Sequence, residues 1–184
     1  NQQVLNTGII SSQASEAIYL QGTGAKVDNA GKISSIEYFG VAINGADGVV
    51  VNPGDIEAGS VGVYMIGAGG YVSNGGNIAS AANRGVLFND GGNMINTGTV
   101  NAFLDAVTFS STSDALFDNS GTLSSHGASG VSVAGNESFV TNSGSITAHL
   151  YGINSFSEYG SILNSGEINA GSNGIYHLGG LGEY

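Results

Sequence analysis

The side chains able to do chemistry in this chain are 14 acidic residues and three histidines, because the sequence contains no cysteine. Two carboxylates facing one cleft about 5–9.5 Å apart would suit glycoside hydrolysis. Histidines converging with a third ligand would bind zinc, and clustered carboxylate and amide oxygens would bind Ca²⁺. The choice among these chemistries depends on the elements that position the side chains.

One motif repeats along the whole chain and indicates what those elements are. An asparagine followed two positions later by glycine recurs every 22 or 23 residues. The asparagines are Asn6, Asn29, Asn52, Asn74, Asn96, Asn119, Asn142 and Asn164. An apolar residue stands two positions before each of them, as at Val27, and an aliphatic residue four positions after, as at Ile33. A fixed period of this length is the signature of a solenoid.

The recurrent positions lie two residues apart, which is the period of a β-strand. The leucine-rich repeat has a similar period, but its leucine pattern and helical return are absent. A unit of 22 or 23 residues cannot bury its own apolar face, whereas stacked units can. We therefore expect residues 1–184 to be one all-β segment, a right-handed parallel β-helix (a single-stranded solenoid) of about eight coils of 22–23 residues, and a fragment of a longer protein.

Both residues of the motif have a structural interpretation in this fold. By parity the asparagine faces inward, where a buried amide must be hydrogen-bonded. Stacked coils allow each amide to donate to the same asparagine one coil away, so we expect a structural ladder of up to eight members. The glycine is expected to take a positive φ at the turn. The alternative, a ligand array, is disfavoured because amides that bond to one another make poor ligands.

The carboxylates on the strands do not pair when they are placed on the repeat. Asp55 and Glu167 share a position but lie five coils apart, and Glu57 stands alone at its own position. Asp28 and Asp118 share a column four coils apart. This spacing argues against a polysaccharide hydrolase or lyase, and we expect no catalytic residue and no enzyme.

Further acids lie in the turns that precede the coils, at Asp47, Asp90, Asp114, Glu137 and Glu158. We interpret them as a solvated acidic edge and expect no cofactor. Weak Ca²⁺ binding at Asn44/Asp47 or Asn89/Asp90 is the alternative. His126 and His149 fall in corresponding turns one coil apart. Because a third ligand is missing, we expect them to be exposed turn residues and not a metal site.

Exposed aromatic side chains are the better indication of a binding surface. The candidates are Tyr19 and Tyr64, at outward strand positions, and Tyr38, Phe39, Phe103 and Tyr151, in turns. Such side chains stack on sugars or anchor a protein partner, or else they only cover neighbouring backbone. The outward residues Leu5, Val51, Ile95 and Leu163 are a second candidate surface, for lateral self-association.

Runs such as VTNSGSITA (Val140–Ala148) and ILNSGEINA (Ile162–Ala170) resemble the Asn-Ser-Gly-x-Ile repeats of passenger domains in Gram-negative autotransporters and haemagglutinin-like exoproteins. The resemblance covers essentially the whole chain. It implies a passenger that is secreted or displayed at the bacterial surface, anchored in the outer membrane through a barrel outside this chain. Passengers of this type are commonly adhesins.

The charge and hydropathy of the chain restrict the classes of partner it can bind. A net charge of −11 with three basic residues argues against nucleic acid and anionic lipid, and no stretch is apolar for long enough to insert in a membrane. We expect an adhesin-type rod for host-cell, matrix or self adhesion, whose partner is a host surface protein, a glycan or a second copy. The alternatives are a polysaccharide-active enzyme and a spacer without ligand.

Overall fold

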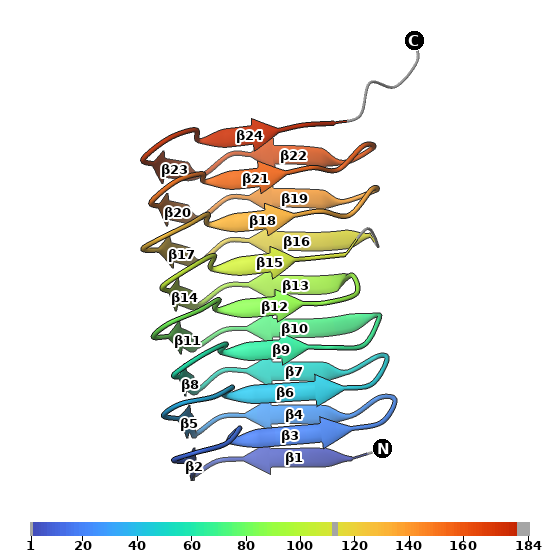
Figure 1. Ribbon diagram of the computed structural model, residues 1–184, viewed down its shortest axis with the longest axis vertical. Helices are drawn as coiled ribbons and strands as arrows, with labels where there is room; N and C mark the ends of the chain where they lie inside the picture. Colours follow the sequence, from blue (N-terminus) through green and yellow to red (C-terminus); the bar gives the residue numbers. More distant parts are fainter. Residues whose placement is uncertain (1, 112–113, 180–184) are drawn as a thin grey trace.

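The computed structural model describes residues 2–111 and 114–179, which form 24 strands and no helix. The strands build three parallel sheets of eight strands, and each coil gives one strand to each sheet (Figure 1). The all-β solenoid of about eight coils that the repeat predicts is confirmed.

The three sheets are named by their order within a coil. The first contains β1 (Gln3–Asn6), β4 (Lys26–Asn29), β7 (Val49–Asn52), β10 (Gly70–Asn74), β13 (Gly92–Asn96), β16 (Ala115–Asn119), β19 (Phe139–Asn142) and β22 (Ser161–Asn164). The second contains β2 (Ile9–Ser12), β5 (Lys32–Ser35), β8 (Asp55–Ala58), β11 (Asn77–Ser80), β14 (Thr99–Ala102), β17 (Thr122–Ser125), β20 (Ser145–Ala148) and β23 (Glu167–Ala170). The third contains β3 (Ile18–Gln21), β6 (Val41–Asn44), β9 (Val63–Met65), β12 (Val86–Phe88), β15 (Val107–Phe109), β18 (Val131–Val133), β21 (Ile153–Ser155) and β24 (Ile175–His177).

The core is a set of columns that run through the stack. Equivalent residues pair across neighbouring coils, as Val50 does with Val72, and Ile56 with Ile78. All four of these side chains are fully buried. Because alternate strand residues point to opposite faces, one inward residue in register generates a continuous apolar column and leaves its neighbours on the outside.

Aromatic rings fill the middle of this core. The rings of Phe88 and Phe109 stack with their centroids 4.6 Å apart, and Phe117 lies 6.4 Å from Phe109. All three are at most 1% exposed. Neighbouring coils hold smaller inward residues, such as Met65 and Val133, at the positions equivalent to Phe88 and Phe109.

The eight asparagines form the expected ladder along the ends of the first-sheet strands. From Asn6 to Asn142, each Nδ2 donates to the Oδ1 of the asparagine in the next coil at 2.7–2.8 Å. Several also donate to a backbone carbonyl, as Asn29 does to Asp55 at 3.0 Å. From Asn6 to Asn142 the side chains are at most 5% exposed, so the ladder supplies the hydrogen bonds that burial of these amides requires.

The glycines of the motif have a different role from the one expected. None of the eight has a positive φ, so that expectation is wrong. At seven of them, from Gly31 to Gly166, a Cβ would collide with the backbone carbonyl of the equivalent glycine one coil earlier. At Gly8, in the first described coil, nothing lies within 4 Å of that Cβ position. Glycine is therefore required here because successive turns approach so closely.

Candidate functional site

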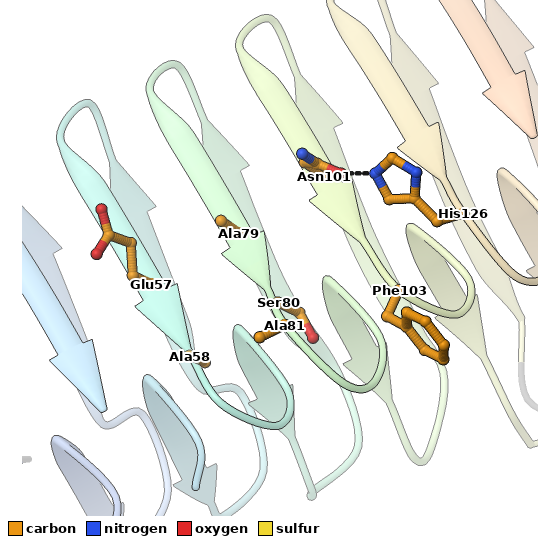
Figure 2. A pocket seen from close by; sticks show the side chains of 8 residues that line it. All are labelled: Glu57, Ala58, Ala79, Ser80, Ala81, Asn101, Phe103 and His126. Atoms are coloured by element: carbon orange, nitrogen blue, oxygen red, sulfur yellow. Dashed lines mark hydrogen bonds between the residues drawn. The ribbon is translucent and has the colours of Figure 1, made fainter. Parts of the chain in front are cut away.

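The outer face of the second sheet carries a hollow of about 400 Å³ (Figure 2). Its lining comes from four successive coils and consists of Glu57, Ala58, Ala79, Ser80, Ala81, Asn101, Phe103 and His126. The hollow is open to solvent, and Ala58 and Ser80, which are buried, contribute to its floor.

Small side chains in one coil create the hollow. Glu57, Ala79 and Asn101 are register partners in β8, β11 and β14, so they form one outward column. Ala79 and Ala81 present only methyl groups between Glu57 on one side and Asn101 and Phe103 on the other (Figure 2). The hollow is thus bounded by longer side chains two coils apart, a separation of about 10 Å.

A histidine and an asparagine form one wall. Nε2 of His126 lies 2.9 Å from Oδ1 of Asn101, one coil earlier. An amide oxygen can only accept a hydrogen bond, so Nε2 carries the proton in this pair and Nδ1 remains for another partner. Phe103 stands beside them in the turn after β14, with 51% of its surface exposed.

A second hollow of about 310 Å³ continues the first along the rod. The two share Glu57, Ala58 and Ala81, and the second adds Lys32, Ser34, Ser35, Ile36 and Gly59. Nζ of Lys32 lies 2.7 Å from Oε2 of Glu57 at the junction. The two hollows together are called the groove below; its lining residues come from five successive coils.

The aromatic binding candidates are dispersed along the rod. Phe39 and Tyr64 meet edge to face with ring centroids 5.2 Å apart. Tyr151 stacks on Tyr176 at the same separation, five coils further on. In each pair one ring packs against the other. Of the six candidates only Phe103 lines the groove.

Tyr19 and Tyr38 are the two candidates exposed by nearly half, at 45% and 46%. The hydroxyl of Tyr19 accepts hydrogen bonds from Nε2 of Gln21 at 3.2 Å and Nδ2 of Asn44 at 3.1 Å. These bonds hold the pKa of Tyr19 below its usual value, because they favour the charged phenolate. Neither tyrosine lines the groove.

The titratable side chains of the groove do not form a catalytic pair. Glu57 is the only carboxylate in its lining. No group of three or more histidine, cysteine, aspartate or glutamate residues that could hold a metal occurs within residues 2–111 and 114–179. His126 and His149 both directly follow strands of the second sheet, β17 and β20, but only His126 reaches the groove.

The second candidate surface lies on the first sheet. Leu5, Val51, Ile95 and Leu163 do share one outward column. Asp28, Ser73, Asp118 and Thr141 occupy the intervening positions of the same column. The column is therefore not a continuous apolar strip.

Sequence reasoning did not identify the groove. In the sequence, Phe103 and His126 are separate turn residues and Glu57 is an isolated acid, whereas Ala79, Ala81 and Asn101 carry no signal by themselves. A short outward residue in one coil, flanked by long ones in the neighbouring coils of the same column, is the pattern that would reveal such a hollow.

Comparisons of the chain with protein families, with curated proteins and with solved structures found no match. Among the described residues, no helix is long and apolar enough to span a bilayer.

Proposed function

We propose that this chain is a non-enzymatic adhesin-type segment of a secreted or surface-displayed bacterial protein. Its role is to hold a binding surface for host cells, matrix or other bacteria on a rigid rod. The observation that carries the proposal is the groove, an open, partly polar depression across five coils with an exposed aromatic side chain in its wall.

The stack supports a role in display. Each coil is held to its neighbours by one strand in each of the three sheets, by one asparagine of the ladder and by the apolar columns. Seven coil-to-coil steps make a rod roughly 34 Å long. A binding site built on these strands and on the turns that follow them is held in place by the stack.

Binding without turnover fits the groove better than hydrolysis does. A glycosidase needs a second carboxylate within about 5–9.5 Å of the first. Glu57 has no carboxylate beside it in the groove lining, and its Oε2 lies 2.7 Å from Nζ of Lys32. The secretion route and the bacterial surface location rest on the resemblance of the Asn-Ser-Gly runs to autotransporter passengers.

The test is a binding titration with the purified chain. Fluorescently labelled protein is added at rising concentration to cultured epithelial cells and to wells coated with fibronectin or collagen, and its own multimerisation is followed by light scattering. Saturable binding to one of these surfaces, or saturable self-association, is expected. Linear, unsaturable signal in every arm would identify a spacer, and release of reducing ends from polysaccharides would identify an enzyme.

A further inference from the structure

We propose that the groove binds a neutral, extended glycan, with one sugar ring lying against Phe103 and with hydroxyls along the glycan bonded to Asn101, His126 and Glu57. This inference rests on the proposed adhesive function and assigns it a site and a class of ligand.

Phe103 provides the apolar contact. It is 51% exposed, and it has no ring partner among the described residues, unlike the Phe39–Tyr64 and Tyr151–Tyr176 pairs. The C–H face of a sugar ring is apolar and flat enough to cover an aromatic ring, while its edge carries the hydroxyls. A phenyl ring held beside polar groups suits that division of surfaces.

The polar groups that line the hollow can both donate and accept. Three side-chain atoms of the hollow make no hydrogen bond to the described residues: Nδ2 of Asn101, Nδ1 of His126 and Oε1 of Glu57. The other carboxylate oxygen of Glu57, Oε2, pairs with Lys32. Of the three atoms, one is a donor and the other two are acceptors. A hydroxyl group does both at once, so hydroxyls along a glycan that spans the hollow match this set, whereas a purely apolar peptide side chain would leave it unsatisfied.

The negative charge of the chain disfavours binding of acidic glycans. The chain has a net charge of −11, and the groove holds one cation, Lys32, which Glu57 already neutralises at 2.7 Å. A sulfated or uronic-acid polymer would approach a negative surface with no free cation in the described groove lining to receive it. The ligand is therefore neutral.

The length of the groove favours an extended glycan. The hollows share three lining residues and continue from the coil of Lys32 to that of His126. Residues at the two ends of this run lie four coil spacings apart, or about 19 Å. A groove that is long and open along the rod suits several linked sugars better than a single one.

The test measures binding of the whole chain to immobilised neutral oligosaccharides built of hexose and N-acetylhexosamine units, with heparin as the anionic comparison. Saturable binding to a neutral oligosaccharide is expected, with none to heparin. Phe103→Ala is expected to weaken it about tenfold or more, as truncation of an aromatic anchor does. Phe139→Ala is the matched control, since Phe139 is also 51% exposed but lies in the first sheet, and it should leave affinity unchanged.

Treated cells separate failure of this inference from failure of the adhesive function. Binding that is lost after periodate oxidation of cell-surface glycans and lost with Phe103→Ala supports the glycan site. Binding that survives periodate but is lost after protease treatment of the cells overturns the glycan site and leaves the adhesin, with a protein partner. Equal effects of Phe103→Ala and Phe139→Ala would also overturn it. Absence of binding to untreated cells, matrix and self overturns the proposed function itself.

Discussion

Asn52 donates from Nδ2 to Oδ1 of Asn74 at 2.8 Å, although the two residues are 22 positions apart in the chain. Both side chains are at most 1% exposed. The same contact recurs from one end of the stack to the other, so the ladder reports directly on whether the coils are in register.

Loss of one inner member of the ladder should destabilise the whole stack. Asn74→Ala removes the donor to the buried Oδ1 of Asn96, and it leaves Nδ2 of Asn52 with the carbonyl of Asn77 alone. We expect a loss of about 2–4 kcal/mol in the free energy of unfolding, measured by urea titration. Asn164→Ala is the control at the exposed end of the ladder and should cost less than about 1 kcal/mol. Equal losses for the two variants would show that the inner bonds are not stabilising.

The glycine at the turn can be tested in the same matched way. A Cβ on Gly98 would collide with the carbonyl oxygen of Gly76, whereas a Cβ on Gly8 meets nothing within 4 Å. We expect Gly98→Ala to lower stability by about 3 kcal/mol or more, since the backbones of two coils must separate, and Gly8→Ala to change it by less than about 1 kcal/mol. If instead backbone conformation were the reason for glycine, both substitutions would be similarly harmful.

Truncation of a core ring tests the continuous interior. The ring of Phe109 stacks on that of Phe88, and its centroid lies 6.4 Å from that of Phe117. Phe109→Ala should cost about 3–5 kcal/mol through the cavity it leaves, while Phe103→Ala, on the surface, should cost less than about 1 kcal/mol. Thermal and urea unfolding followed by circular dichroism would measure both. A small effect at Phe109 would contradict a packed core in these coils.

Filling the hollow should remove adhesion without unfolding the protein. Ala79 and Ala81 form its low centre, and Ala79 points outward between Glu57 and Asn101. Ala79→Leu should therefore abolish saturable binding to cells or matrix and change stability by less than about 0.5 kcal/mol. Thr147→Leu, at an outward position of the same column outside the groove lining, should leave binding unchanged. Unaltered binding by Ala79→Leu would exclude this hollow as the site.

The fold was predictable because the repeat acts on every coil at once. Asn52, Val50 and Ile56 occur at fixed spacings, and parity alone places all three in the interior. The role of Gly98 was not predictable, since sequence does not distinguish a turn that needs a positive φ from a close approach of two backbones. Only the three-dimensional register shows the carbonyl of Gly76 against it.

The groove could not be predicted from the repeat for a related reason. It depends on outward residues, which vary from coil to coil because no shared core constrains them. Phe103 was a candidate on its own, but its proximity to the His126–Asn101 pair follows from how one turn lies over the next strand. The repeat places such residues in the same coil or in adjacent coils without indicating which of them meet.

Distances between spin labels along one outward column test the stacked register most directly. The chain has no cysteine, so a label at Ser34→Cys can be combined in turn with one at Ser124→Cys, Thr147→Cys or Asn169→Cys. These residues belong to one column of the second sheet, four, five and six coils from Ser34. Pulsed electron paramagnetic resonance should give mean distances that rise by about 4.8 Å per coil, near 19, 24 and 29 Å. Distances that do not increase in this order, or that increase by a clearly different step, would contradict the stacking of equivalent residues.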